Sequence, residues 1–286
     1  MHEQPELVFT VDDLRRRLAI ARREGRRVGL APTMGALHAG HASLVDASRA
    51  ECGCTVATIF VNPTQFGPNE DYSRYPRTLE ADLHLLAGRA DMVFVPEAAA
   101  VYPPGHATRV EVGGVAARWE GEFRPGHFGG VATVVLKLFN MVGADVAYFG
   151  QKDYQQVKVV EQMVRDLDVP IAIRVCPIVR EPDGLAMSSR NRYLSIDERR
   201  QALVLWQALQ RATALAEAGE NRAGKLAEAM RETIANAPLA RIDYAAVVDR
   251  QTLEPLETID RGAVALLAVR VGGTRLIDNC LLPGRK

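Results

Sequence analysis

The feature that most constrains the fold is a strand, turn, helix and strand near the start of the chain. An apolar run over residues 28–31 leads into the turn 32–41, a helical pattern that begins near His41, and an almost unbroken apolar and β-branched run over 55–61. Such a run is typical of a strand covered on both faces. Two strands joined through a helix imply a right-handed parallel crossover. The chain is therefore expected to build a parallel α/β sheet.

Two imidazoles lie in that turn. His38 and His41 are three residues apart and can face the same way. A helix start offers unpaired N–H groups and a partial positive charge, and Gly35 and Gly40 let an anion approach the backbone. Metal ligation is the competing interpretation, but no third ligand is placed suggestively nearby. We therefore interpret the turn as a phosphate site.

The alternation continues along the first two thirds of the chain. Helices are expected over 11–23, 76–88, 131–142 and 154–167, and extended segments over 92–96, 146–150 and 171–179. The breakers in 102–130 indicate a surface excursion. Ligands bind outside the carboxyl ends of parallel strands, so the loops that carry His38, Asn62, Gln65, Lys152 and Ser188 should meet in one crevice.

The pattern of expected helices and strands changes beyond residue 181. Helices over 197–218 and 223–234 precede strands over 242–248, 264–271 and 274–278, which predicts a small α+β module. The fold class is thus α/β: a Rossmann-like, doubly wound parallel sheet with a second, smaller α+β domain. We expect 1–181 to bind nucleotide and substrate, and 182–286 to form a C-terminal lid.

Charge and composition exclude several classes of protein. Thirty-five basic residues balance 35 acidic ones, which argues against binding nucleic acid through a general positive field. No apolar run is long enough to cross a bilayer. The acidic amino terminus lacks the basic start and apolar core of a secretory signal, so a cytoplasmic location is expected. The four cysteines are interpreted as free thiols.

Two further motifs could bind nucleotide. Ser188, Ser189 and Arg190 combine hydroxyl groups with a guanidinium that can pair bidentately with phosphate, although a hydrophilic linker would look similar. Lys152 follows a strand and would add a point charge, while Asp153 could accept from a ribose hydroxyl. An ordinary capped helix start is the alternative for that pair.

Seven segments together resemble the pantothenate synthetase family: 32–41, 60–66, 75–78, 124–128, 149–156, 183–184 with 187–192, and 276–279. The resemblance covers nearly the whole chain. It implies a nucleotidylyltransferase-superfamily enzyme that uses ATP to join pantoate to β-alanine, through a pantoyl adenylate and with release of AMP and pyrophosphate. It also implies Mg²⁺ as a cofactor and a homodimer.

The resemblance assigns roles to individual residues. The catalytic set is His38, His41, Lys152 and Arg190. The implied ATP contacts are Met34, Gly35, Ala36, Leu37, His38, Ala39, Gly40, His41, Gly150, Gln151, Lys152, Asp153, Val179, Met187, Ser188, Ser189 and Arg190. Gln65 and Gln156 would hold pantoate, because amides bind a carboxylate without adding a charge that quenches it. Asn62 is counted with them among the substrate-binding residues, as a residue that shapes the loop or lies on the phosphate side.

Other residues keep two interpretations. No protein ligand is assigned to Mg²⁺, with Asp82 kept as a candidate. Arg124 and His127 could line the crevice or belong to a turn packed for structural reasons.

Two other functions remain open at the level of sequence. A nucleotidylyltransferase could transfer AMP to a phosphorylated metabolite, but such an acceptor would call for cations where Gln65 and Gln156 stand. A nucleotide sensor without catalysis is the third interpretation of the same motifs.

Overall fold

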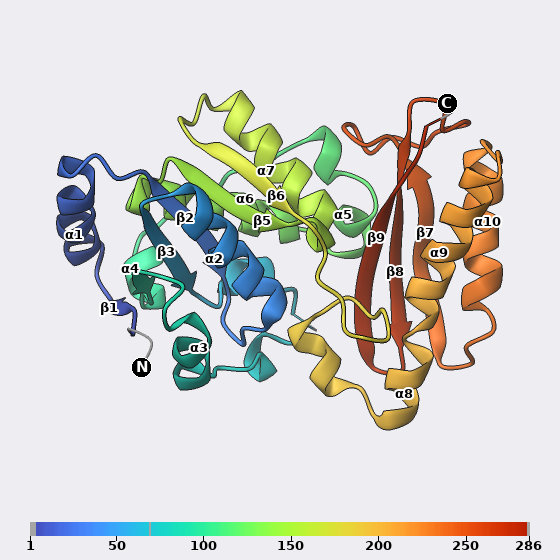
Figure 1. Ribbon diagram of the computed structural model, residues 1–286, viewed down its shortest axis with the longest axis horizontal. Helices are drawn as coiled ribbons and strands as arrows, with labels where there is room; N and C mark the ends of the chain where they lie inside the picture. Colours follow the sequence, from blue (N-terminus) through green and yellow to red (C-terminus); the bar gives the residue numbers. More distant parts are fainter. Residues whose placement is uncertain (1–3, 69, 285–286) are drawn as a thin grey trace. The chain divides into compact units, whose positions relative to one another are not determined.

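The computed structural model describes residues 4–68 and 70–284 (Figure 1). It divides into two compact units. The first comprises the chain up to Gln151 together with Gln156–Pro177, and the second comprises Lys152–Gln155 and the chain from Ile178 onward. The division therefore falls a few residues before the expected boundary after residue 181 and assigns 152–155 to the second unit. The functions assigned to the two domains stay predictions.

The first unit is built on a six-stranded sheet in which every pairing is parallel. Its order is β1-β4-β3-β2-β5-β6. The strands are β1 (Glu6–Val8), β2 (Val28–Thr33), β3 (Cys54–Ile59), β4 (Met92–Phe94), β5 (Val146–Gly150) and β6 (Ala172–Cys176). The predicted parallel sheet is confirmed, whereas β1 was not predicted, because three residues give too little periodicity to detect.

Helices cover both faces of this sheet. One face carries α1 (Val11–Arg23), α6 (His127–Val142) and α7 (Tyr154–Asp166); the other carries α2 (Ala39–Glu51) and α3 (Leu79–Leu86). Side chains alternate along the strands: Leu30 of β2 packs with Leu14 and Leu138, whereas Ala31 packs with Val45. The doubly wound architecture expected from the sequence is confirmed. Two short helices, α4 (Ala98–Val101) and α5 (Glu120–Phe123), lie in the connection between β4 and α6.

The beginning of α6 corrects the sequence-based expectation. The helix was expected from residue 131 because Gly129 and Gly130 look like breakers, yet it begins at His127 directly after the left-handed Gly126, whose φ is +80°. A Cβ on Gly130 would lie 2.3 Å from the carbonyl oxygen of Thr64. The glycine therefore permits close packing of the helix on a loop and does not end it.

The order of the strands creates a switch point. From β2 the chain builds outward through β3 to β4, and then returns to β5 on the opposite side of β2. The turn after β2, the loop after β3 and the segment after β5 consequently begin at the carboxyl ends of three neighbouring strands. This is where open α/β sheets bind their ligands.

The second unit contains an antiparallel sheet of β7 (Ala240–Val248), β8 (Ala263–Val271) and β9 (Thr274–Leu282). Leu209 of α9 (Val204–Glu217) and Met230 of α10 (Ala223–Ile234) pack with Leu267 of β8 in its core. The single helix expected over 197–218 is two helices, α8 (Ile196–Gln201) and α9, and no glycine or proline marks the break between them.

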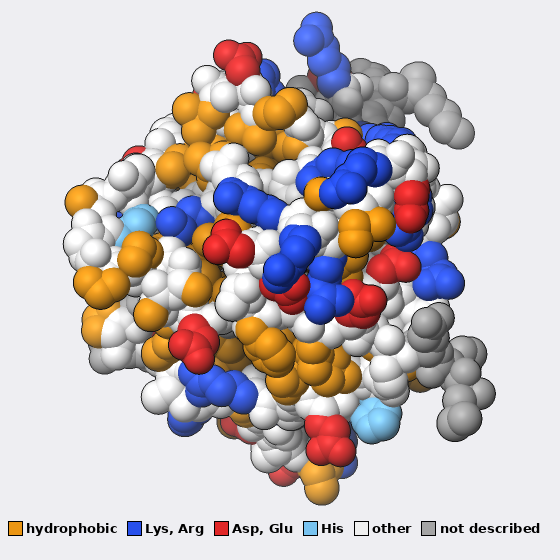
Figure 2. All heavy atoms as spheres, turned by 90° about the vertical axis from the view of Figure 1, so that its left-hand side faces the viewer, with side chains coloured by type: hydrophobic (Ala, Val, Ile, Leu, Met, Phe, Trp, Pro, Cys, Tyr) orange, Lys and Arg blue, Asp and Glu red, His pale blue; other side chains and the backbone are white. Residues whose placement is uncertain are grey.

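Charged side chains of both signs are interspersed on the face shown in Figure 2. On α1, for example, Arg16 and Arg17 both pair with Asp13. This mixture is consistent with the equal numbers of acidic and basic residues. Within the ranges that the structure describes, no helix is both long and apolar enough to cross a membrane.

Candidate active site

The two histidines of the turn cap α2 together. His38 is the N-cap residue, and its Nδ1 accepts from the backbone N–H of Gly40 at 3.2 Å. His41 Nδ1 accepts from the backbone N–H of His38 at 3.3 Å, and the ring centroids lie 4.1 Å apart. Since both Nδ1 atoms accept hydrogen bonds, the hydrogen-bond pattern assigns the proton of each neutral ring to Nε2. Both rings therefore carry an N–H donor of the kind that binds an anionic oxygen.

A buried carboxylate holds the turn from the side. Asp82, on α3, is 2% exposed, and its two oxygens accept from the backbone N–H groups of Ala36 at 3.0 Å and Leu37 at 2.8 Å. The hydroxyl of Thr78 adds a third bond at 3.1 Å. Gly35 precedes these residues with a φ of +82°, and Ala36 has a φ of +51°. The carboxylate thus stabilises a left-handed stretch that most residues disfavour.

These bonds correct the expected mode of anion binding. The N–H groups of Ala36, Leu37, His38 and Gly40 are already bonded to side chains of the protein. The turn is therefore not the cradle of unpaired N–H groups that the glycines indicated. Within this turn the two imidazoles are therefore the candidate anion-binding groups, and that role stays a prediction.

The loop after β3 places Gln65 beside the turn. Gln65 lies in a short 3-10 helix, Pro63–Gln65, and is 9% exposed. Its Nε2 donates to Sδ of Met34 at 3.1 Å, and its Oε1 accepts from Nδ2 of Asn62 at 3.0 Å. Asn62 also caps the 3-10 helix by accepting from the N–H of Thr64 at 3.3 Å. These contacts support the loop-shaping role of Asn62, and its direct contact with a substrate stays a prediction.

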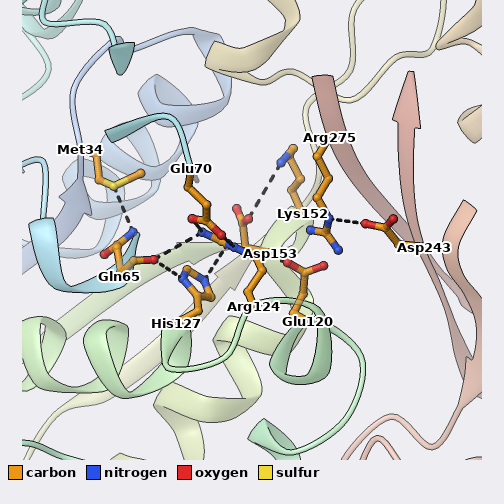
Figure 3. Close-up of polar contacts among 10 residues, drawn as sticks. All are labelled: Met34, Gln65, Glu70, Glu120, Arg124, His127, Lys152, Asp153, Asp243 and Arg275. Carbon is orange, nitrogen blue, oxygen red and sulfur yellow. Dashed lines mark hydrogen bonds and ion pairs between the residues drawn. The ribbon is translucent and has the colours of Figure 1, made fainter. Parts of the chain in front are cut away.

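Arg124, the residue that follows α5, and His127, the first residue of α6, contact the same loop (Figure 3). His127 Nδ1 lies 2.9 Å from the carbonyl oxygen of Gln65, and its Nε2 lies 3.0 Å from Nη1 of Arg124. Arg124 pairs bidentately with Glu70 at 2.7 and 2.6 Å. Burial, reinforced by the charge of Arg124, lowers the pKa of His127 to about 4. The segment 124–128 is therefore a packed, hydrogen-bonded support for the Gln65 loop.

In the second unit, a tight turn brings together two of the expected nucleotide contacts. The N–H of Met187 donates to the carbonyl of Val179 at 3.0 Å. Ser188 then caps the 3-10 helix Ser189–Tyr193 by accepting from the N–H of Arg190 at 3.3 Å. Asn191 fastens this helix to Glu181 at 2.8 Å. The hydroxyl and guanidinium groups expected to bind phosphate thus share one short, anchored segment.

Asn279 anchors the backbone of Lys152; it belongs to the segment 276–279, to which the resemblance assigned no role. Asn279 Nδ2 donates to the backbone carbonyl of Lys152 at 3.0 Å. The neighbouring Asp278 is 3% exposed and pairs with Arg180 at 2.7 and 2.9 Å, while the guanidinium of Arg180 stacks 3.8 Å over Trp206. Burial raises the pKa of Asp278 even though Arg180 favours its charged form. The pairs Lys152 with Asp153 and Arg275 with Asp243 are drawn in Figure 3.

The remaining predicted site residues lie at the ends of strands and at the starts of helices. Ala39 and Gly40 open α2, Gly150 ends β5, Gln151–Asp153 form a 3-10 turn, and Gln156 lies half-buried in the first turn of α7. The structure brings Met34, Asn62 and Gln65 together in the first unit, and Val179 with Met187 in the second. Sequence reasoning missed the supports, namely Glu70 and Asn279, and considered Asp82 only as a metal ligand. The one available signal of such a support was a polar residue that lies within a family motif and has no assigned role, as Asn279 does.

The described residues contain no group of three or more histidine, cysteine or acidic side chains able to hold a metal ion. Asp82, the candidate for Mg²⁺, is instead occupied by two backbone N–H groups and a hydroxyl. Nothing in its geometry favours a metal ligand.

Comparison with known proteins agrees with the motifs. A family model described as pantoate-beta-alanine ligase matches residues 6–281. The pantothenate synthetase of Acidobacterium capsulatum is 57% identical over 258 residues, which cover 90% of this chain and 86% of that protein. The pantothenate synthetase of Herpetosiphon aurantiacus is 51% identical over 279 residues, covering 97% of this chain and all of its own length, 100%.

Solved structures share both fold and sequence with this chain. The pantothenate synthetase from Thermus thermophilus is 49% identical with a TM-score of 0.91, covering 96% of this chain and 98% of that one. The pantoate-beta-alanine ligase from Francisella tularensis, solved as a complex with beta-gamma ATP and beta-alanine, is 34% identical with a TM-score of 0.79 and 97% coverage of both chains. On this evidence the chain belongs to the pantoate-beta-alanine ligase family, the family of the pantothenate synthetases.

Proposed function

We propose that this enzyme condenses pantoate with β-alanine in two steps, through an enzyme-bound pantoyl adenylate. The observation that carries the proposal is the contact of Gln65 with Met34. It puts an uncharged amide, suited to a carboxylate, directly against the turn that bears His38 and His41. A carboxylate nucleophile and a phosphate electrophile would then be held side by side.

In the first step, a carboxylate oxygen of pantoate attacks the α-phosphorus of ATP. The new P–O bond forms as the bond to the β-phosphate oxygen breaks, and pyrophosphate leaves. Both reactants are anions, so the barrier falls when fixed donors stabilise the charge of the transition state. We assign this role to the Nε2–H groups of His38 and His41, the ammonium of Lys152 and the guanidinium of Arg190.

In the second step, the neutral amine of β-alanine attacks the carbonyl carbon of the adenylate. The C–N bond forms, the C–O bond to AMP breaks, and the amine loses a proton. The acyl group is already activated because AMP is a good leaving group, so this step needs no nucleophile from the protein. Gln65 and Gln156 hold the pantoyl group throughout, because their amides can donate to oxygen and accept from hydroxyls.

We assign the remaining nucleotide contacts to three segments. Residues 34–41 and 150–153 line the phosphates and the ribose, and Asp153 accepts from a ribose hydroxyl. Val179 and Met187 contact the adenine. Ser188 and Ser189 donate to phosphate oxygens. Mg²⁺ is proposed to arrive with ATP, held by phosphate oxygens and water, since the described residues form no protein cage for it.

The second unit is proposed to act as a lid. Its segment 188–190 would close on the phosphates and exclude water, which otherwise hydrolyses the adenylate. A change in small-angle scattering when ATP and pantoate are added tests this closure, and an unchanged profile contradicts it. We further propose a cytoplasmic homodimer; light scattering at micromolar concentration checks the oligomeric state.

Isotope transfer tests the adenylate directly. Enzyme is incubated with ATP and pantoate labelled with ¹⁸O in its carboxylate, first without and then with β-alanine. We expect pyrophosphate in a burst equal to the enzyme concentration, followed on addition of the amine by pantothenate and AMP that carries one ¹⁸O atom. Unlabelled AMP, or no pyrophosphate before the amine is added, would contradict the two-step route.

A further inference from the structure

The amide of Gln65 is held in one orientation by contacts that leave no ambiguity between its oxygen and its nitrogen. The N–H of Thr64 can only donate, so it fixes Oδ1 of Asn62 as an acceptor at 3.3 Å. The hydroxyl of Tyr102 also reaches this oxygen, at 2.8 Å. The Nδ2 of Asn62 must then face Gln65, whose Oε1 accepts at 3.0 Å. The Nε2 of Gln65 is consequently the donor that points at Met34.

Met34 is a weak partner for that donor. A thioether sulfur accepts hydrogen bonds poorly, whereas a carboxylate oxygen accepts them strongly. The N–H group of Gln65 is thus oriented in advance and can pass from sulfur to an arriving carboxylate. Orienting a donor before the ligand binds increases affinity because the ordering cost has already been met in folding.

The backbone of Gln65 is held by a second set of contacts, which comes from a distant part of the sequence. Arginine can only donate, so Nη1 of Arg124 requires Nε2 of His127 to accept, at 3.0 Å. The ring proton therefore lies on Nδ1 and is donated to the carbonyl oxygen of Gln65 at 2.9 Å. Nη2 of Arg124 approaches the same oxygen at 3.4 Å, and Glu70 holds the guanidinium on its other edge.

We propose that Arg124, His127 and Glu70 are positioning residues, which set the affinity for the hydroxy-acid substrate by fixing Gln65 without touching the substrate themselves. The proposal rests on the assignment of Gln65 to the pantoate carboxylate. It also resolves the two interpretations of segment 124–128: the turn is packed, and its packing serves the site. Only a neutral imidazole completes this arrangement, since a proton on Nε2 would face the guanidinium.

A double-mutant cycle between Arg124 and Gln65 tests the proposal. Arg124→Lys keeps the charge but loses the planar fork that serves Glu70, His127 and Gln65 together. We expect the KM for pantoate to rise about tenfold while the KM for ATP changes by less than about twofold. Gln65→Ala should raise the KM for pantoate at least as much. The double variant should be no worse than Gln65→Ala alone, because Arg124 acts only through Gln65.

Arg22→Lys is the matched control. Arg22 also donates to backbone carbonyls of the same unit, those of Val142 at 2.7 Å and Gly143 at 2.8 Å, at the far end of α6. It should lower the melting temperature as Arg124→Lys does, with the KM for pantoate unchanged. His127→Gln provides a second variant, with the same selective rise in the KM for pantoate, should Arg124→Lys fold poorly.

The outcomes distinguish the positioning role of Arg124 from the assignment of Gln65 to the pantoate carboxylate. Multiplicative effects in the double variant, or equal increases in both KM values for Arg124→Lys, overturn the positioning role while leaving the assignment of Gln65 intact. An unchanged KM for pantoate in Gln65→Ala overturns that assignment, and the positioning role with it.

Discussion

Asp82 accepts a hydrogen bond from the backbone N–H of Leu37 at 2.8 Å, so a buried carboxylate of α3 fixes the residue that directly precedes the two histidines. The other oxygen of the same carboxylate holds Ala36. The shape of the turn, and with it the direction of both imidazoles, thus depends on a side chain more than forty residues away in the sequence.

Replacing Asp82 with asparagine should impair the turn. Asparagine has one acceptor oxygen, so its NH₂ group would face one of the two backbone N–H groups and leave it unpaired. A buried N–H without a partner costs about 1–3 kcal/mol. We expect this loss in the free energy of unfolding measured with urea, together with a fall of about tenfold or more in the rate of pyrophosphate release.

Asp91→Asn is the control for that change. Asp91 also accepts a backbone bond, from the N–H of Thr55 at 2.7 Å, but at the amino-terminal end of the sheet. It should lower stability without a matching loss of rate. The apparent affinity for Mg²⁺ should be unchanged in Asp82→Asn; a large decrease would make Asp82 a metal ligand and contradict its structural role.

Adjacent glycines at the start of α6 should respond in opposite ways to alanine. A Cβ on Gly130 would meet backbone, the carbonyl oxygen of Thr64 at 2.3 Å and Cα of Gln65 at 2.8 Å. The atoms nearest to a Cβ on Gly129 would be the ends of the flexible side chains of Glu111 and Arg109. Alanine within a helix is favoured over glycine by about 1 kcal/mol, so Gly129→Ala should be close to neutral or slightly stabilising.

Gly130→Ala should instead displace the loop that carries Gln65. We expect a loss of roughly 1–3 kcal/mol in stability and a higher KM for pantoate, measured by urea unfolding and initial rates. Equal stabilities and equal KM values for the two variants would contradict the close approach of α6 to the loop.

The fold could be predicted from the sequence because its determinants are local. Apolar runs predict β2, β3 and β5, and the periodicity of residues 11–23 predicts α1. In the structure Thr10 caps this helix by accepting from the N–H of Asp13 at 3.3 Å. The break between α8 and α9 was missed because it carries no glycine or proline. The start of α6 was placed too late because a glycine pair signals a helix break and close packing equally well.

The candidate site was predictable only in part, for a related reason. His38, His41 and Gln65 carry functional groups that chemistry singles out, and motif spacing locates them. The side chains that support the site do not: Asp82, Arg124 and, beside Lys152, Asn279 act through contacts with backbone distant in sequence. No spacing rule encodes such a contact. The expected cradle of free N–H groups was wrong partly for the same reason, because Ala36 and Leu37 donate to Asp82 on another helix. His38 and Gly40 donate instead to the imidazole rings of the turn itself.

His127 should make stability depend on pH in a defined window. Its pKa is lowered from 6.5 to about 4 by burial and by Arg124, although Glu70 and Glu120 oppose the shift. The unfolded chain takes up a proton near 6.5 and the folded chain only near 4. The contribution of the neutral ring is therefore complete above pH 6.5 and is lost as the pH falls toward 4, by about 1.4 kcal/mol for each pH unit.

Urea unfolding of the native chain and His127→Gln at several values of pH checks this. Acidic groups with a lowered pKa, such as Glu70, become protonated at low pH and thereby lower the stability of both proteins. The difference between the two proteins isolates the imidazole, and it should shrink between pH 6.5 and 4. A difference that stays constant over this window would mean that the folded imidazole titrates normally.

His41 serves both the turn and the reaction, and two substitutions can separate these roles. Its Nδ1 accepts from the backbone N–H of His38, and its Nε2 carries the donor assigned to the phosphate. In His41→Asn, the amide oxygen can replace Nδ1 as the acceptor, but no group replaces Nε2–H; in His41→Ala both are lost. His41→Asn should therefore keep the melting temperature of the native chain, and its KM for ATP should change by less than about threefold. The rate of pyrophosphate release should fall about a hundredfold, as expected when a donor to the transition state is lost. His41→Ala should show the same fall in rate together with a loss of about 1 kcal/mol in stability from the missing cap. Parallel losses in rate and in ATP binding for His41→Asn would instead assign Nε2 to binding of the ground state.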